Sequence, residues 1–259
     1  MTDTDIALAH ALADAAGDAI RPFYRATFTT DRKADASPVT DADRAAEAAM
    51  RAIIEEKCPE DAIIGEEFGE KSGTSGRTWV LDPIDGTTSF IAGRPIFGTL
   101  IALLKDGWPT LGVIDQPIGR ERWTGATGRP TLFNGVPVTT RPCRMLSEAV
   151  LATTSPHLFT DHEAGHFMAL AKTCDTRRLI WGGDCYNYGL VALGQVDLVA
   201  ETGLKLYDYA ALVPIVEGAG GHMCDWQGDP LHAESAGDVL AVGDPARVEE
   251  TLDALAAGH

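Results

Sequence analysis

The 259-residue chain lacks the features that mark several large classes of protein. No apolar run approaches the roughly 20 residues that a membrane-spanning helix needs, and the acidic start Met1–Asp5 differs from a secretory signal. The five cysteines are scattered, without the spacing of a disulfide framework or a zinc knuckle. The motif Gly-x-x-x-x-Gly-Lys-[Ser/Thr] does not occur, which excludes P-loop nucleotide hydrolysis. From these absences we expect a cytoplasmic protein that keeps its thiols reduced.

Basic residues are also scarce, with 21 lysines and arginines against 38 aspartates and glutamates, so the formal net charge is −17. An acidic surface repels nucleic acids and anionic membranes, and we expect neither as a partner. A small anionic metabolite is not excluded, because metal ions bound in a site can supply the positive charge. The apolar share of 45% is ample for a continuous core.

Apolar residues recur at helical spacing in several segments, and short apolar runs separate these segments. The predicted helices cover residues 6–23, 41–57, 163–172, 184–193 and 208–217, followed by a closing helix. The predicted strands cover residues 62–65, 78–81, 98–104, 109–114, 149–153, 178–181, 197–200 and 238–242. Strands and helices interleaved in this way are typical of a layered α/β architecture. We expect one unit over residues 1–259, with an N-terminal α+β lobe over about 1–145 and a C-terminal α/β lobe over about 146–259.

Two local signals refine this pattern. Asp106-Gly107 stands between two apolar runs, which predicts a tight hairpin. Pro214 falls inside the predicted helix 208–217, where it removes the hydrogen bond to the Ala210 carbonyl and should kink the helix.

The segment with the most chemical information follows an apolar strand that we expect to end directly at Asp82. Asp85 comes three residues later, and Gly86 permits a sharp turn. This spacing can aim two carboxylates and the Ile84 carbonyl at one point, and magnesium prefers such oxygen ligands. If Thr87 opens a helical turn, its amide faces a phosphate oxygen favourably. The alternative is that both aspartates serve only as turn formers.

Three further acidic sites stand where a ligand set needs them. Glu66 and Glu67 follow a predicted strand, although paired acids of this kind are usually solvated. Asp43 lies near the start of the helix 41–57, where it alternatively closes a capping box with Thr40. Asp208 is expected to begin the helix 208–217, where it alternatively serves as an N-cap.

In this order and setting, the residues resemble the inositol monophosphatase family, the lithium-sensitive sugar-phosphatase superfamily. The matching segments are Lys33 with Ser37–Thr40 and Asp43, then Glu66-Glu67, Asp82–Thr87, Tyr207-Asp208 and Glu217–Gly221. The likeness covers most of the chain, from near residue 30 to near residue 221, and the hexad Asp-Pro-Ile-Asp-Gly-Thr is highly specific. The resemblance implies an αβαβα sandwich that assembles as a homodimer.

The resemblance also implies a magnesium centre of two or three ions per site. Glu66, Asp82 and the Ile84 carbonyl would hold the first ion, and Asp82, Asp85 and Asp208 would hold the second. Carboxylates that converge in one cleft repel one another without cations. Two metal ions relieve this repulsion, lower the pKa of a bound water and clamp the oxygens of an in-line displacement. The implied activity is magnesium-dependent hydrolysis of a phosphate monoester on a small metabolite.

The remaining roles implied by the resemblance concern phosphate, water and substrate. The backbone amides of Gly86 and Thr87 would bind the phosphate. Glu66 and the Thr87 hydroxyl would orient and deprotonate the attacking water, with Asp43 close to that chemistry. Glu201, seven residues before Asp208, would bind a second group of the substrate.

The segment Trp181–Gly189 points to one branch of the family. Together with 89–95 and 203–208, it resembles the histidinol phosphatases. Asp184 and Glu201 would offer negative charge to the ammonium and imidazole of histidinol phosphate, a substrate in histidine biosynthesis. Alternatively, Asp184 caps the helix that it begins, and the substrate is inositol monophosphate or a broad range of sugar phosphates.

Three other interpretations are weighed against the phosphatase. A covalent aspartyl-phosphate mechanism needs an acid two residues after the nucleophile, whereas Asp82 and Asp85 are three apart. A metal-dependent binding protein would have no need of the water-activating residues, and a phosphate-release assay separates it. The pentad His162–His166 formally matches the zinc motif His-Glu-x-x-His, but we favour a solvated helix start because the motif is short.

Overall fold

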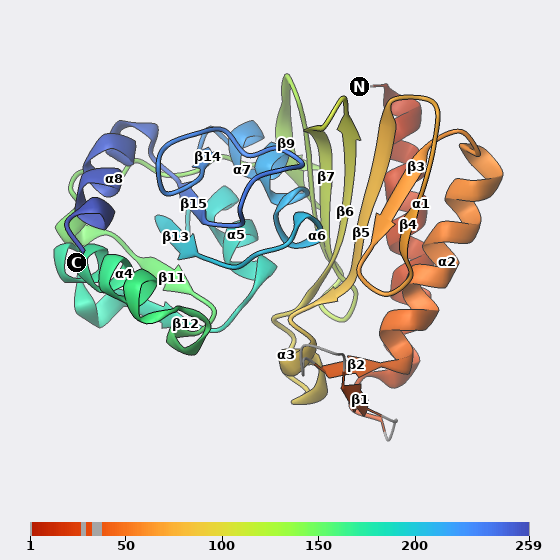
Figure 1. Cartoon of the computed structure of the whole chain (residues 1–259), viewed down its shortest axis with the longest axis horizontal. Helices are drawn as coiled ribbons and strands as arrows, with labels where there is room; N and C mark the ends of the chain where they lie inside the picture. Colours follow the sequence, from red (N-terminus) through yellow and green to blue (C-terminus); the bar gives the residue numbers. More distant parts are fainter. Residues whose placement is uncertain (1, 27–29, 33–37, 259) are drawn as a thin grey trace.

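The structure, a computed structural model, describes residues 2–26, 30–32 and 38–258. Its elements stack as five alternating layers of helices and sheets (Figure 1). Three apolar clusters fill the spaces between the layers. The predicted αβαβα sandwich is therefore confirmed.

The first layer is formed by two antiparallel helices that pack on one face of the larger sheet. These helices are α1 (Asp3–Ile20) and α2 (Asp41–Lys57). Thr2 and Thr40 begin them with capping boxes, in which the third helical residue is an aspartate. Their apolar faces pack on Trp79 and other side chains of the sheet. A short ladder of β1 (Thr30–Arg32) and β2 (Pro38–Thr40) precedes α2.

The larger sheet has eight strands in the order β10-β9-β8-β7-β6-β5-β3-β4, and among the described strands of this sheet only β3 and β5 pair in parallel. Its strands are β3 (Ala62–Gly65), β4 (Gly69–Lys71), β5 (Arg77–Asp85), β6 (Gly98–Lys105), β7 (Trp108–Gln116), β8 (Glu121–Ala126), β9 (Arg129–Phe133) and β10 (Val136–Pro137). The hairpin at Asp106-Gly107 is confirmed, and both residues have positive φ. Strands β8 and β9 were not predicted, because charged and polar residues interrupt their apolar pattern.

The expectation that the strand before the aspartates ends at Asp82 is wrong. Strand β5 continues to Asp85, and its register with β6 shifts between these two residues. The Pro83 carbonyl accepts a hydrogen bond from the Thr99 hydroxyl at 2.7 Å instead of joining the regular ladder. A proline lacks the N–H that a ladder needs, so the chain stays extended while its carboxylates leave the plane of the sheet.

The remaining layers belong to the second half of the chain. The middle helices are α5 (Cys185–Ala192), α6 (Leu206–Tyr209) and α7 (Leu212–Gly218). The smaller sheet has the order β12-β11-β13-β15-β14, with β11 (Leu151–Thr153), β12 (Leu179–Trp181), β13 (Leu198–Glu201), β14 (His222–Cys224) and β15 (Val239–Val242). The outer helices are α4 (Asp161–Thr173) and α8 (Val248–Ala256). The division into two lobes near residue 145 stays a prediction, although each sheet comes from one side of it.

The predicted helix 208–217 is two helices, which corrects both its start and its continuity. Helix α6 begins after Lys205, and Asp208 is its third residue rather than its N-cap. Helix α7 starts at Leu212, two residues before Pro214, so the proline accompanies a break and not only a kink. All five cysteines are free, and no helix among the described residues has the length and apolarity needed to cross a membrane.

Candidate active site

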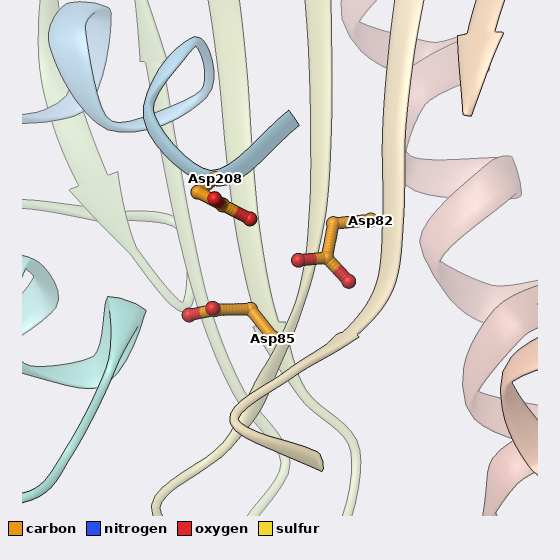
Figure 2. Close-up of side chains that lie close together, drawn as sticks. All are labelled: Asp82, Asp85 and Asp208. Atoms are coloured by element: carbon orange, nitrogen blue, oxygen red, sulfur yellow. The ribbon is translucent and has the colours of Figure 1, made fainter. Parts of the chain in front are cut away.

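Three aspartates from distant parts of the sequence lie close together beside the C-terminal end of β5 in the larger sheet (Figure 2). Asp82 and Asp85 lie on β5, and Asp208 lies on α6, which packs against this strand. One carboxylate oxygen from each lies within 4.8 Å of the other two. Oxygen ligands at this spacing suit a hard divalent cation such as magnesium.

Backbone groups hold each aspartate in this geometry. The Ile84 N–H donates to Asp82 at 3.0 Å, across the irregular part of β5. The Cys185 N–H, at the start of α5, donates to Asp85 at 2.5 Å. The Lys205 N–H donates to Asp208 at 2.6 Å as part of the helix start. The centre is thus built from both halves of the chain.

The pKa values of the three aspartates show how unfavourable it is to hold their negative charges together in this buried group. Burial raises the pKa of Asp82 well above its usual value, and the charges of Glu66 and Asp85 raise it further. Burial and the charge of Asp184 do the same to the pKa of Asp85. Burial raises the pKa of Asp208 to about 7, although the Lys205 N–H opposes that shift. Metal cations remove this repulsion, so the donor set fits a metal centre.

Asp43 fulfils the capping role and also faces the acidic group. Its Oδ2 accepts hydrogen bonds from the Thr40 N–H at 2.8 Å and the Thr40 hydroxyl at 2.6 Å. Its buried Oδ1 has no hydrogen-bond partner among the described residues. Burial raises the pKa of Asp43 to about 6, the Thr40 contacts lower it, and the charges of Glu67 and Glu66 raise it. Asp43 therefore caps α2 with one carboxylate oxygen and lies near enough to Glu67 and Glu66 for their charges to raise its pKa.

Glu47 is a positioning residue that the sequence analysis missed. Its carboxylate is fully buried and accepts from the Glu67 N–H at 2.7 Å and the Phe68 N–H at 3.1 Å. Arg51 pairs with it at 2.7 Å. A Cβ at Gly65 would collide with the Glu47 carboxylate, so glycine is required there. The sequence signal that could have identified Glu47 is its helical spacing from Asp43 and the apolar residues, which places it on the buried face of α2.

Gly86 and Thr87 form the turn that the sequence assigns to phosphate. Gly86 adopts φ 89°, precedes α3 (Thr87–Ile91), and would place a Cβ 2.7 Å from an Asp184 carboxylate oxygen. Both the conformation and this close approach require glycine. The first amides of a helix have no intrahelical acceptor and are available to an anion. The Thr87 hydroxyl donates to the Ile84 carbonyl at 3.1 Å, which brings two predicted site residues together.

A cavity of about 240 Å³ opens beside the aspartates. It is lined by Asp85, Asp208, Asp184, Glu201 and neighbouring polar and apolar side chains, which include Ser155, Leu158, Phe159 and Leu204. Glu201 is 7% exposed and accepts from the Thr154 N–H at 2.7 Å and the Tyr188 hydroxyl at 2.8 Å. Burial raises the pKa of Glu201, and these two donors oppose the shift. Neither donor was predicted, because no local sequence signal links it to Glu201.

Asp184 does not cap the helix that follows it. Its side chain makes no capping hydrogen bond, and its φ of 45° is unusual for a residue other than glycine. Burial and the charge of Glu201 raise the pKa of Asp184 to about 7, while Arg94 and Ser89 lower it. The capping alternative is wrong, and the side chain is held at the cavity wall.

Two further segments that the sequence singles out complete the comparison with the structure. Lys33 and Ser37 lie outside the described residues. The helix start at the pentad His162–His166 is confirmed, since Thr160 is the N-cap of α4 and the Glu163 carboxylate accepts the Thr160 N–H at 2.6 Å. His162 is exposed at this helix start.

The fold and the acidic centre together define a class of protein. A carboxylate cluster that fits metal ions, next to a helix start that suits phosphate, is typical of proteins that hydrolyse phosphate esters with metal assistance. The model of the "Inositol monophosphatase family" matches residues 1–257. The chain therefore belongs to the inositol monophosphatase family, a metal-dependent family of phosphatases that act on small phosphate esters.

Individual relatives agree with this assignment. The chain is 48% identical over 98% of its length to a bifunctional phosphatase, IMPL2, of Arabidopsis thaliana, and covers 77% of that protein. It is 39% identical to a histidinol-phosphatase of Mycobacterium tuberculosis, over 88% of this chain and 90% of that protein. A solved structure of an inositol monophosphatase from Zymomonas mobilis is 57% identical, with a TM-score of 0.90 over 98% of both chains.

Proposed function

We propose that this chain is a magnesium-dependent phosphatase whose substrate is histidinol phosphate. The observation that carries the proposal is the joint position of the aspartate cluster, the Gly86-Thr87 turn and the acidic wall of the cavity. The relative from Mycobacterium tuberculosis, which is named as a histidinol-phosphatase, supports this substrate. The inositol monophosphatase from Zymomonas mobilis supports the second candidate, inositol 1-phosphate.

The metal ligands we propose are the family set. Glu66, Asp82 and the Ile84 carbonyl hold one magnesium ion, and Asp82, Asp85 and Asp208 hold a second. Bound magnesium would supply positive charge to the phosphate and lower the pKa of a bound water. The raised pKa values of Asp82, Asp85 and Asp208 support this assignment, because each reports a carboxylate in need of a cation.

The chain's own groups position the phosphate and the water. The first amides of α3, from Gly86 and Thr87, bind phosphate oxygens. The Thr87 hydroxyl and Glu66 orient the attacking water, and Glu66 accepts its proton. Asp43 has an oxygen without a hydrogen-bond partner among the described residues and a pKa that the charges of Glu67 and Glu66 raise, which supports a role close to that chemistry.

The acidic wall of the cavity selects the organic part of the substrate. Asp184 and Glu201 provide negative charge at one end of the cavity, where the ammonium and the imidazole of histidinol phosphate would bind. Leu158 and Phe159 add apolar surface to the lining of the same cavity, which suits an aromatic ring. Inositol carries neutral hydroxyls alone and gains less from two buried carboxylates.

The direct test is phosphate release from histidinol phosphate, inositol 1-phosphate and fructose 1,6-bisphosphate, each with magnesium and with a chelator. We expect release that requires magnesium, and a higher kcat/KM for histidinol phosphate. A preference for inositol 1-phosphate would overturn the substrate and keep the phosphatase. Full activity in the chelator would overturn the metal centre.

We also propose that the chain assembles as a homodimer, as the family resemblance implies. Light scattering of the purified chain would give twice the mass of 27.5 kDa. A monomer mass across the assay concentrations would contradict this assembly without bearing on the chemistry.

A further inference from the structure

A pair of histidines on α4 lies apart from the residues of the active site. His162 and His166 are one helical turn apart, and their Nε2 atoms are 3.2 Å from each other. The two ring centroids are 4.4 Å apart with planes at 67°. Two imidazole nitrogens bound to one metal ion at the usual 2.0–2.1 Å, with tetrahedral angles, lie roughly 3.3 Å apart. The spacing of this pair therefore equals that of two ligands of a single ion.

A contact from a different helix fixes which nitrogen of His166 is free to bind. Its Nδ1 lies 2.7 Å from the carbonyl oxygen of Leu255 on α8. A carbonyl only accepts hydrogen bonds, so Nδ1 carries the proton and Nε2 of the neutral ring presents a lone pair toward His162. Histidines that bind metals are oriented by the same arrangement, with the second nitrogen donating to a carbonyl or carboxylate.

The surroundings of the pair favour a cation. The histidines border a pocket of about 460 Å³ that also contains the carboxylates of Glu163, Asp238 and Asp253. Among the described residues that line this pocket there is no lysine or arginine. Within the described part of the chain, no third His, Cys, Asp or Glu atom closes a three-ligand group with the pair. Two protein ligands and water would therefore complete the coordination.

The role of Glu163 separates this site from a zinc peptidase. A peptidase of the His-Glu-x-x-His type uses the glutamate as a general base. Here the Glu163 carboxylate accepts the Thr160 N–H at 2.6 Å and stabilises the first turn of α4. The pentad therefore keeps the ligand pair of that motif without its catalytic base.

We propose that His162 and His166 form a binding site for a divalent transition metal such as Zn²⁺ or Cu²⁺, separate from the magnesium centre. The ligand chemistry distinguishes the two sites: imidazole nitrogens select zinc, copper and nickel, whereas carboxylate and carbonyl oxygens select magnesium. The site joins α4 to α8, because the ring of His166 is held by the Leu255 carbonyl.

The test is Zn²⁺ binding to the tag-free full chain, measured by calorimetry in saturating Mg²⁺, which occupies the oxygen-ligand centre. We expect one Zn²⁺ per chain, and an affinity at least about tenfold lower in His162→Ala and in His166→Ala. The matched control is His157→Ala, an exposed histidine near the same helix start, which should bind Zn²⁺ as the unmodified chain does. Equal affinity in His162→Ala and the unmodified chain would overturn the proposal.

Trp226 provides a second, local readout. Its ring lies 6.3 Å from that of His166, so Cu²⁺ bound by the pair should quench its fluorescence. We expect Trp226→Phe to lose most of the quenching while keeping the Zn²⁺ stoichiometry, and His162→Ala to lose both. Quenching that persists unchanged in His162→Ala would place the copper elsewhere and overturn the site. Phosphate release in Mg²⁺ should be the same in His162→Ala as in the unmodified chain.

Discussion

The residues that we propose for the phosphate (the phosphate end) and those that we propose for the organic part of the substrate (the substrate end) are built in different ways, although Asp184 lies against Gly86. At the phosphate end, Asp82, Asp85 and Gly86 stand within five consecutive residues on one distorted strand and its turn. At the substrate end, Asp184 precedes α5 and Glu201 ends β13, and Glu201 accepts hydrogen bonds from Thr154 and from Tyr188 on α5. The positions of the residues at the phosphate end follow from local sequence, and those at the substrate end follow from the packing of the C-terminal half. We therefore expect substitutions at the first end to remove all turnover, and those at the second to change selectivity.

The largest effect is expected at the metal ligands. Asp85→Asn removes a charged oxygen from the cluster and should reduce magnesium-dependent phosphate release to background for every substrate. The fold should persist, because an amide relieves the repulsion that the Asp184 charge exerts on Asp85. Phosphate release and thermal unfolding are measured side by side. Activity within a few-fold of the unmodified chain would remove Asp85 from the metal centre.

Glu66→Gln should lower kcat far more than it raises KM. Positioned general-base catalysis contributes roughly 10²- to 10⁴-fold, and the amide oxygen still reaches a metal ion weakly. Steady-state kinetics on the preferred substrate separate the two parameters. An unchanged kcat with a raised KM would assign Glu66 to substrate binding alone.

Glu47 should affect the phosphate end indirectly, through the backbone that follows Glu66. Glu47→Ala leaves two part-buried amides without their acceptor, which should lower the unfolding free energy by about 1–3 kcal/mol in total. It should also lower kcat by about 10- to 100-fold, as loss of groups that orient metal ligands does. Glu47→Gln keeps an acceptor and should recover part of kcat. Equal loss in both variants, tracking stability alone, would make Glu47 purely structural.

The smallest effect is expected on the stability of the metal-free protein. The pKa of Asp208 is raised to about 7, so this group favours the folded state below its unfolded pKa, and that contribution is lost as pH rises through about 7. In a chelator, Asp208→Asn should therefore be more stable than the unmodified chain at pH 8. The difference should vanish near pH 4. Denaturant unfolding at the two pH values checks this, and a destabilised variant at pH 8 would contradict it.

The same contrast explains what could be predicted from the sequence. The helix 41–57 and the hairpin at Asp106-Gly107 were predicted correctly, because capping, apolar period and turn residues are local signals. The family and the layered fold followed from contiguous motifs. The cluster of Asp82, Asp85 and Asp208 agrees with the ligand set implied by the resemblance.

The missed features depend on tertiary contacts. The extension of β5 to Asp85 includes an irregular stretch in which the Thr99 hydroxyl from the neighbouring strand donates to the Pro83 carbonyl. In the sequence Glu47 is indistinguishable from an exposed helix glutamate. Only the fold brings Gly65 and the segment after it against its carboxylate. The positive φ of Asp184 is imposed by its packing, so a capping role seemed reasonable from sequence alone.

The most direct test of the account is the ratio of kcat/KM for histidinol phosphate to that for inositol 1-phosphate, in the unmodified chain and in Asp184→Asn. A hydrogen bond to a charged group contributes roughly 1.5–3 kcal/mol, which is about a ten- to hundredfold change in specificity. We expect the ratio to favour histidinol phosphate and to fall by this factor in the variant, while turnover of inositol 1-phosphate stays nearly constant. An equal loss on both substrates would contradict charge pairing at Asp184 and the division of the cavity into a catalytic and a selective end.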